Sequence, residues 1–390
     1  MKGLLTMARK IGFALVLAIA AAAGVFFFVV PSRVDRSLNK IVPHAPYEVS
    51  EEAQALHESL RLADLHDDAL LWDRDFSKRQ TRGHTDAPRL IEGGYRLQIL
   101  AAVTKTPKNM NYDQNSGDTD NITLLTIAQR WPVKTWSSLA ERALHIARRA
   151  HEAERRSSGA VAIIRSKEDL RERMEAEGLA VILATEGAHP LEGDLENIDR
   201  LYDAGYRVLG LQHFFDNELG GSLHGASHRG LTEFGRKAVA AAQEKGMIID
   251  IAHSSEAVVR DVLAISSAPI IVSHTGLRGN CDSPRNLPDE LMIETAAKGG
   301  LIGVGFWDGA VCDPSVPSIA RAIAYAVDLV GADHVALGSD YDGATTVPFD
   351  ASEAAALTQA LLNEGLDAAT IKAVMGETAI RFFEENLPEK

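Results

Sequence analysis

The stretch Asp64-Leu65-His66-Asp67-Asp68 follows a short apolar run about one sixth of the way along this chain of 390 residues. Successive side chains of a β-strand point to opposite faces, so Asp64, His66 and Asp68 share one face if the stretch belongs to a strand. Imidazole and carboxylate groups on one face are ligands that zinc, manganese and iron accept. An exposed polar turn can have the same sequence. This stretch alone therefore does not distinguish a metal site from a turn, and the rest of the chain is needed.

Eight apolar runs are expected to form strands. They are Leu60–Leu65, Arg96–Thr104, Leu179–Thr185, Arg207–Gln212, Met247–Ala252, Pro269–Ser273, Gly300–Phe306 and His334–Ser339. Amphipathic stretches such as Ser138–Arg156 and Glu233–Lys245 separate them. Strands that alternate with helices pair in parallel through right-handed crossovers, and eight such units close into a barrel. The sequence therefore predicts an α/β fold, a (β/α)8 TIM-like barrel, with final helices over Ser352–Glu364 and Asp367–Glu385.

Residues that can bind a metal or move a proton stand at the ends of six of these runs. They are His66, Asp68, Glu186, His213, His253, His274 and Asp340. In a parallel barrel the carboxyl ends of all strands share one face, where such barrels place their active sites. We therefore expect these four histidines and three carboxylates around one mouth, which favours a metal site over a polar turn.

The other histidines divide into two groups. Five lie in helical stretches, in the N-terminal segment or at a strand start, and are expected to be solvated or structural: His44, His57, His145, His151 and His334. Four lie in loops that could border the mouth: His84, His189, His224 and His228.

Composition limits the class of protein. Hydrophobic residues make up 46% and charged residues 24%, which is typical of a globular chain. The net charge of −14 and the lack of a basic cluster exclude nucleic acid as an expected partner. Two cysteines, Cys281 and Cys312, either pair or stay free.

The run Ile11–Val30 carries no charge and is long enough to cross a bilayer, at about 1.5 Å per residue. Its length favours an uncleaved anchor with the barrel on the exported, extracytoplasmic or periplasmic side, whereas Ala20–Gly24 would suit signal cleavage and a secreted protein. We expect residues 1–32 to be this anchor or signal segment, 33–55 a linker or stalk, and 56–390 the barrel. On this layout the span contributes nothing to the site.

With these features, the chain resembles the membrane dipeptidase family, the renal-dipeptidase-like metallopeptidases of the amidohydrolase superfamily, from about Ala63 to Phe383. The segments that carry the resemblance are Asp64-Leu65-His66-Asp67-Asp68, His84-Thr85-Asp86-Ala87-Pro88-Arg89-Leu90, Thr185-Glu186-Gly187, Gly230-Leu231-Thr232-Glu233-Phe234-Gly235, Asp250-Ile251-Ala252-His253-Ser254, Val272-Ser273-His274, Pro284-Arg285-Asn286-Leu287-Pro288-Asp289 and Gly338-Ser339-Asp340-Tyr341-Asp342-Gly343. The chain departs from the family at Arg96–Leu100, which is less aromatic, and at the loop Asn217–His228. These departures concern the pocket and not the metals.

The resemblance implies two divalent metal ions, most often Zn²⁺. Glu186 would bridge them, with His66 and Asp68 completing one ion and His253 and His274 the other. Two such ions share a water, lower its pKa and polarise the scissile carbonyl.

The resemblance also implies a dipeptide substrate with a free carboxylate. His213 would stabilise the oxyanion, Asp340 would act as the acid/base, and Arg285 would hold the carboxylate through a bidentate fork. His213, Asp340 and Gly343 would also line the substrate site.

Two other functions stay open. The first is another amidohydrolase reaction, on a lactone, cyclic amide or phosphoester, because one barrel hosts many chemistries. The second is a membrane-tethered binding protein without activity, although no expected ligand is missing. A homodimer is also left open.

Overall fold

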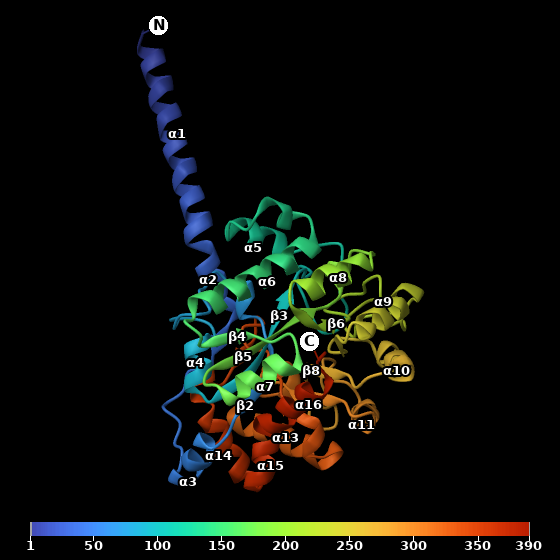
Figure 1. Ribbon diagram of the computed structural model, residues 1–390. Helices are drawn as coiled ribbons and strands as arrows, with labels where there is room; N and C mark the ends of the chain where they lie inside the picture. The colour runs from blue at the N-terminus through green and yellow to red at the C-terminus, as the bar shows by residue number, and fades with distance from the viewer. Residues whose placement is uncertain (1, 390) are drawn as a thin grey trace.

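The computed structural model describes residues 2–389, and a closed parallel barrel forms its centre (Figure 1). The barrel strands are β2 (Leu62–Asp67), β3 (Tyr95–Val103), β5 (Leu179–Glu186), β6 (Tyr206–Gly210), β7 (Ile248–Asp250), β8 (Ile271–Thr275), β9 (Leu301–Val304) and β10 (Val335–Leu337). They neighbour one another in the order β3-β2-β10-β9-β8-β7-β6-β5, and pairing of β3 with β5 closes the ring. The (β/α)8 prediction is confirmed, and each of the eight predicted runs overlaps one barrel strand.

One strand of the large sheet was not predicted. β4 (Val161–Ile163) pairs in parallel with β5 beside the barrel. It has three residues, as β7 and β10 do, and its pairing with β5 alone is what places it in the sheet outside the ring.

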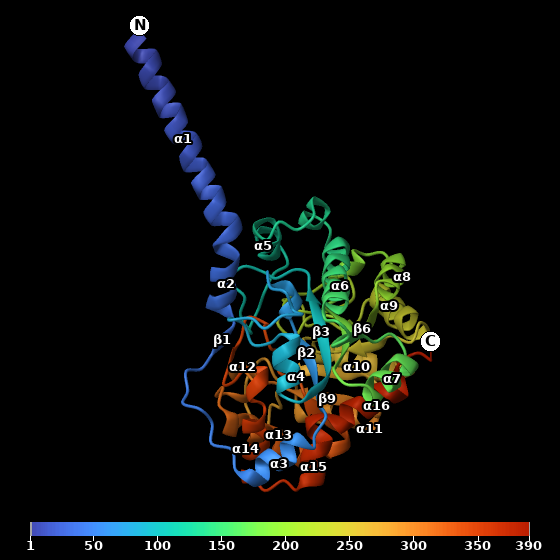
Figure 2. The same cartoon turned by 60° about the vertical axis from the view of Figure 1, so that its left-hand side comes forward.

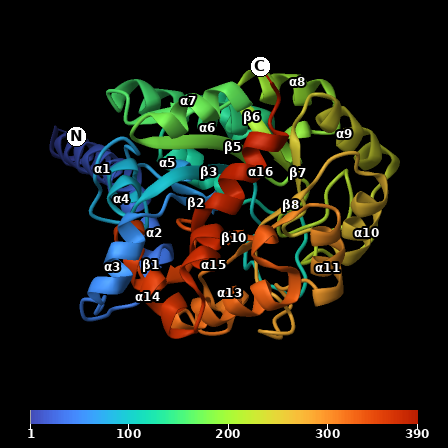
Figure 3. The same cartoon turned by 60° about the horizontal axis from the view of Figure 1, so that its bottom comes forward.

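Helices surround the barrel, as Figure 3 shows with the bottom of the molecule turned forward. They are α4 (Ala87–Glu92), α5 (Ile122–Ala128), α6 (Leu139–Arg156), α7 (Lys167–Glu175), α8 (Glu196–Asp203), α9 (Glu233–Glu244), α10 (Glu256–Ile265), α11 (Asp289–Ala297), α12 (Asp308–Val311), α13 (Val316–Val330), α14 (Ala355–Asn363), α15 (Ala368–Lys372) and α16 (Thr378–Asn386). Several begin where a side chain caps the first turn; Ser138 accepts a hydrogen bond from the Glu141 amide, and Ser255 accepts one from Val258.

Strand β5 illustrates how the core forms. Ala180, Ile182 and Ala184 belong to one buried apolar cluster together with residues of α16. The alternate residues Leu179 and Leu183 belong to the larger cluster under the surrounding helices. Both faces are therefore buried, which explains why the strand reads as a continuous apolar run.

The N-terminal helix α1 (Lys2–Phe28) projects away from the barrel and continues into α2 (Val30–Leu38) (Figure 2). Residues Arg9–Leu38 include a window that is long and apolar enough to cross a membrane, with none of it buried in the protein.

The segment 33–55 is not a free linker, so that expectation needs correction. It contains α2, β1 (Lys40–Ile41), which pairs with β11 (Thr346–Val347), and α3 (Glu51–Glu58). Pro31 stands in the first turn of α2, where the missing N–H costs nothing, and so it starts a helix instead of a stalk. Within this segment, only Asn39 and residues 42–50 lack helix and strand.

Candidate metal centre and active site

The fold brings all seven predicted strand-end residues to the carboxyl end of the barrel. His66 lies in β2, Glu186 ends β5 and His274 lies in β8. Asp68 directly follows β2, and His213, His253 and Asp340 lie in the loops after β6, β7 and β10. All seven side chains are buried: His66, Asp68, Glu186, His213, His253, His274 and Asp340.

Glu186 is the centre of this cluster. Its Oε1 lies 3.6 Å from the Nε2 of His66 and 3.3 Å from that of His213. The corresponding distances are 3.2 Å to His253 and 3.5 Å to His274. One carboxylate therefore faces four imidazoles, and the His253 and His274 Nε2 atoms lie only 2.9 Å apart.

The donor atoms form three overlapping groups, within each of which they lie no more than 4.8 Å apart. The groups are His66, Glu186 and His274; Glu186, His213 and His253; and His66, Asp68 and Asp340. His213 and Asp340, expected as catalytic and substrate-binding residues and not as ligands, thus lie as close to the cluster as the expected ligands do.

The cluster fits divalent cations. Among the described residues, His66 Nε2 and Asp68 Oδ1 are buried without a hydrogen-bond partner. Buried polar atoms are normally paired, and a cation would satisfy both of these. Imidazole nitrogen and carboxylate oxygen are the donors that zinc prefers.

The electrostatics of the cluster also favour a cation. Burial raises the pKa of the Glu186 carboxyl, and the Asp68 carboxylate raises it further. Burial opposes protonation of His66, but the carboxylates of Glu186 and Asp68 outweigh it and raise its pKa to about 10. Burial lowers the pKa of His253 and His274, so both stay neutral and can bind a metal.

Outer residues orient the ligands. Ser273 Oγ lies 2.9 Å from His274 Nδ1 and 3.3 Å from His66 Nδ1. The Asp64 carboxylate accepts hydrogen bonds from the Ser339 amide and hydroxyl at 2.7 and 2.8 Å. Asp64 therefore ties β2 to the end of β10. Neither role was expected from the sequence, although Ser273 and Asp64 both stand inside the motifs that carry the family resemblance.

Asp340 sits in a loop of unusual backbone conformation. Asp340, Asp342 and Ala344 have φ of 58°, 59° and 62°, in the left-handed region that non-glycine residues rarely adopt. A Cβ on Gly343 would lie 1.9 Å from Asp340 Oδ1, so only glycine fits at that position. Burial raises the pKa of Asp340 to about 8.

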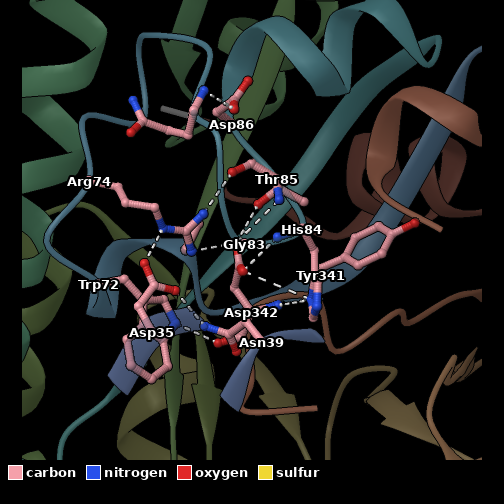
Figure 4. A network of polar contacts seen from close by, with 12 residues as sticks. Asp35, Asn39, Trp72, Arg74, Gly83, His84, Thr85, Asp86, Tyr341 and Asp342 are labelled. Carbon is pink, nitrogen blue, oxygen red and sulfur yellow. Dashed lines mark hydrogen bonds and ion pairs between the residues drawn. The ribbon is translucent and has the colours of Figure 1, made fainter. Parts of the chain in front are cut away.

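A buried polar network holds this loop (Figure 4). Asp342 Oδ2 lies 2.7 Å from Arg74 Nη2, and Asp342 Oδ1 accepts a hydrogen bond of 2.8 Å from the His84 amide. Arg74 Nε lies 3.2 Å from Asp35 Oδ2 in α2. Asn39 accepts a hydrogen bond of 2.9 Å from the Ala344 amide. The segment next to the apolar span is therefore bonded to the loop that carries Asp340, which no sequence motif indicated.

Arg285 is buried beside the cluster. Its Nη2 donates to the His274 carbonyl at 3.0 Å and lies 3.3 Å from His253 Nε2. The guanidinium lies over the Trp307 ring, 5.2 Å from its centre. Cys281 and Cys312 form a disulfide, which connects the loop that carries Arg285 to the C-terminal end of α12, the short helix after Trp307. The sequence left open whether the two cysteines pair or stay free, and the structure shows that they pair.

The remaining histidines mostly follow expectation. His57 is buried, with its Nδ1 2.9 Å from the Thr358 hydroxyl, in a structural role. His224 borders the mouth, with its ring 5.5 Å from that of His253. His84 belongs to the network around Asp342, His189 is buried against Phe215, and His228 is exposed.

These residues open onto one cleft of about 600 Å³. Its inner end is lined by Asp68, Glu186, His213, His253, Arg285, Asp340 and Gly343. Phe26 of α1 and Val30 of α2 line the same cleft. The expectation that the apolar span contributes nothing to the site is therefore wrong, because α1 and α2 form one continuous wall.

A parallel barrel with buried imidazoles and carboxylates at its carboxyl-terminal mouth is the architecture of a metal-dependent barrel hydrolase. The family model described as membrane dipeptidase, peptidase family M19, matches residues 50–389. The chain belongs to this membrane dipeptidase family, as the sequence motifs indicated.

Among curated proteins, dipeptidase 3 of Macaca fascicularis is 27% identical over 319 residues, which cover 78% of this chain and 64% of that protein. Dipeptidase 3 of Mus musculus is 29% identical over 219 residues, or 53% of this chain and 44% of that protein. Dipeptidase verJ of Clonostachys rogersoniana is 29% identical over 233 residues, or 58% of this chain and 60% of that protein. The chain thus matches about half to two thirds of these relatives' lengths.

Solved structures share the fold. A metallopeptidase from Rhodobacter sphaeroides, with a bound phosphinate mimic of the dipeptide L-Ala-D-Ala, has a TM-score of 0.71 at 24% identity. The match covers 84% of this chain and 99% of that one. The probable dipeptidase PvdM from Pseudomonas aeruginosa has a TM-score of 0.72 at 22% identity, and the match covers 86% of this chain and 98% of that one.

Proposed function

We propose that this protein is a metal-dependent dipeptidase that hydrolyses dipeptides with a free C-terminal carboxylate. The observation that carries the proposal is the buried Glu186 facing four imidazoles, with Arg285 in the same cleft. Membership of the membrane dipeptidase family supports it. The relatives named dipeptidase and the neighbour with a bound dipeptide mimic point to the same class of substrate.

The cluster would hold two divalent cations, with Zn²⁺ as the expected metal. We assign His66 and Asp68 to one ion, His253 and His274 to the other, and Glu186 to both. When bound, the two ions would activate a water molecule and polarise the scissile carbonyl.

Each remaining residue has a proposed task. Arg285 binds the substrate carboxylate, because a guanidinium offers a planar fork to two oxygens. His213 donates a hydrogen bond to the oxyanion of the tetrahedral intermediate. Asp340 accepts the proton of the attacking water and passes it to the leaving amine, a transfer that a buried carboxyl of raised pKa can make. Gly343 leaves room for the Asp340 carboxylate beside the substrate.

We further propose that residues 1–32 anchor the protein in a membrane and that the barrel, residues 56–390, lies on the exported side. The length and apolar character of the helix support an anchor. Residues 33–41 would hold the barrel close to the membrane surface, because α2 and β1 pack against it.

The test is hydrolysis by the full-length protein in detergent after reconstitution with Zn²⁺. We expect turnover of alanyl-glycine, little turnover of alanyl-glycine amide, and no turnover of simple lactones or phosphodiesters. Equal hydrolysis of the dipeptide and its amide would show that the substrate does not need a free carboxylate. That result would favour another amidohydrolase reaction. No turnover of any dipeptide, with metal bound, would refute a dipeptidase.

A further inference from the structure

A second cavity, of about 400 Å³, lies between helix α6 and the segment 70–76 that follows β2. The residues of the metal cluster do not line it. α6 presents one face to this cavity, because the lining residues stand three, four or seven positions apart. They are His145, Arg148, Arg149, Glu152 and Arg156. With Arg74 and Asp75 from the segment 70–76, the cavity brings four arginines together with two carboxylates, in a protein of net charge −14.

Both carboxylates of the cavity already have cationic partners. Glu152 Oε1 lies 2.6 Å from Arg156 Nε, and Arg155 pairs with the same side chain. Asp75 Oδ2 lies 3.3 Å from Lys78 Nζ and 3.5 Å from Arg156 Nη1. The negative charge of the cavity is therefore neutralised before its other arginines are considered.

Two of the four arginines lack an acidic partner. Arg74 is paired with Asp35 and Asp342, as described above. Arg148 and Arg149, in contrast, form no ion pair with any of the described residues. The cavity thus carries two positive charges that no carboxylate of the chain compensates at close range.

Arg149 is the more buried of these two arginines. Its Nη2 donates hydrogen bonds to the carbonyls of Trp72 and Arg74, the second at 3.1 Å. Its Nη1 is closed off from solvent and makes no hydrogen bond. Burial lowers the pKa of Arg149 to about 10, so the group is still charged at neutral pH. A charged and partly unpaired guanidinium in such a place is costly unless an anion accompanies it.

His145 experiences the same positive charge. Burial lowers the pKa of His145 to about 4, and the charges of Arg149 and Arg148 lower it further in the same direction. The imidazole is therefore neutral at neutral pH and does not add to the repulsion. Its ring packs 4.5 Å from the ring of Trp131, over which the Arg149 guanidinium also lies. A wall of uncompensated guanidinium groups beside low-dielectric rings creates a positive potential that attracts anions.

The cavity also adjoins the end of the apolar span. Arg130 donates from Nη1 to the Phe27 carbonyl at 2.7 Å, and its Nη2 lies 3.5 Å from Asp73 Oδ2. Asp73 directly precedes the segment's Arg74, and Pro132 lines the cavity itself. If the twenty residues of Ile11–Val30 cross the hydrocarbon core, Phe27 lies at the bilayer boundary, where phospholipid headgroups carry their phosphates.

We propose that the cavity between α6 and the segment 70–76 is a binding site for a phosphate group, held by Arg148 and Arg149. A phosphate presents several acceptor oxygens, and the planar fork of arginine matches two of them at once. Inorganic phosphate from the water and a phospholipid headgroup from the neighbouring leaflet offer the same chemistry. The site is separate from the metal centre, and it does not depend on the reaction that takes place there.

The first experiment is equilibrium dialysis of the full-length protein, in an uncharged detergent, against radiolabelled inorganic phosphate. Arg148→Gln should weaken binding at one site by about tenfold or more, the loss expected for one charge-assisted hydrogen bond. Arg148 is exposed, so folding should survive this change. Arg149→Gln should have at least the same effect. Arg171→Gln, at an exposed arginine of α7 outside the cavity lining, is the matched control and should leave binding unchanged.

The second experiment tests the lipid as the source of the phosphate. The same four proteins are taken from nanodiscs of equal parts phosphatidylglycerol and phosphatidylcholine, and native mass spectrometry counts the lipids that stay bound. We expect the unmodified protein and Arg171→Gln to retain one more phosphatidylglycerol than Arg148→Gln and Arg149→Gln do. An effect in this experiment alone would identify a headgroup, and an effect in dialysis alone would identify a free anion; either result supports the site.

The inference is overturned if neither experiment distinguishes Arg148→Gln from the unmodified protein. Phosphate binding that Arg148→Gln and Arg149→Gln leave unchanged would belong to the metal centre and not to this cavity. An equal loss in Arg171→Gln would show that only the total charge of the protein matters. Neither readout involves hydrolysis, so failure of the proposed dipeptidase function would not affect this test.

Discussion

Asp35 and Arg74 form a buried ion pair, with 3.2 Å between Asp35 Oδ2 and Arg74 Nε. Asp35 belongs to the helix that continues the apolar span, and Arg74 in turn pairs with Asp342, two residues after Asp340. The loop from Asp340 to Ala344 has three residues with positive φ, a strained conformation that persists only where surrounding contacts determine it. Asp35 is therefore a positioning residue for the proposed acid/base.

Asp35→Asn should destabilise the protein and slow the reaction. Breaking a buried ion pair costs about 3 kcal/mol, and the loop that carries Asp340 loses one of its supports. We expect a lower thermal midpoint and a kcat reduced about tenfold, with KM nearly unchanged. Asp73→Asn, which breaks the exposed pair with Arg130, is the control and should cost less than about 1 kcal/mol. A variant with lowered stability but normal kcat would limit Asp35 to a structural role.

Glu186→Gln should reduce metal content from about two equivalents to less than one, because the charge proposed to bridge the two ions is lost while the side-chain shape is kept. Elemental analysis of protein dialysed against metal-free buffer measures this. Glu256→Gln, at a surface pair with Arg278, should retain both ions. One tightly bound ion that is unaffected by Glu186→Gln would contradict the binuclear assignment.

Arg285→Met should lower kcat/KM for alanyl-glycine by roughly tenfold to several hundredfold, since a charge-assisted hydrogen bond contributes about 1.5–3 kcal/mol and more if its partner stays unpaired. The metals should stay bound, and the slow hydrolysis of alanyl-glycine amide should change little. Arg278→Met, half-exposed in the same loop, should leave both substrates unaffected. If the variant loses as much activity on the amide as on the free dipeptide, Arg285 does not bind the carboxylate.

The disulfide between Cys281 and Cys312 closes a segment with a sequence separation of 31 residues. Replacing both cysteines by serine should lower the free energy of unfolding by about 3 kcal/mol, because the unfolded chain gains conformational freedom. We also expect KM for dipeptides to rise, since this bond connects the loop that carries Arg285 to the C-terminal end of α12. Urea unfolding and steady-state kinetics of the double variant test both effects; an unchanged urea midpoint would show that the bond adds no stability.

The buried imidazole of His189 should make the protein less stable in mild acid. Burial, helped by Lys105, lowers the pKa of His189 to about 3, whereas an unfolded histidine titrates near 6.5. As the pH falls below 6.5, His189 takes up a proton in the unfolded chain but stays neutral in the folded chain. The stability present above pH 6.5 is therefore lost progressively until the pH approaches 3.

His189→Leu removes this titration. Between pH 7.5 and 5.5 the variant should lose about 1 kcal/mol less stability than the unmodified protein. Denaturant unfolding at the two pH values measures the difference, and His228→Leu at an exposed position is the control. Equal losses in His189→Leu and the unmodified protein would show that His189 does not contribute to acid sensitivity.

The sequence by itself determined the barrel and the composition of its mouth. Strands buried on both faces must be continuous apolar runs, and β5 and β6 can be recognised in this way. Strands separated by helices must pair in parallel, so the residues that follow them, such as Glu186 and His253, had to meet at one end. These conclusions need only the pattern of apolar residues along the chain and the rule that strands separated by helices pair in parallel. Strand β4, which pairs with β5 outside the ring, was missed.

Only the tertiary structure decided which other residues join the site. Asp35, Arg74 and Asp342 come from segments far apart in the chain, and no local pattern indicates that their charges are buried together. The pairing of Cys281 with Cys312 likewise depends on two loops that meet only in the folded barrel. The apolar helix α1–α2 has the sequence of a membrane span, and its contribution to the cleft comes from packing against the barrel, because a spacing of four residues defines a face but not its partner.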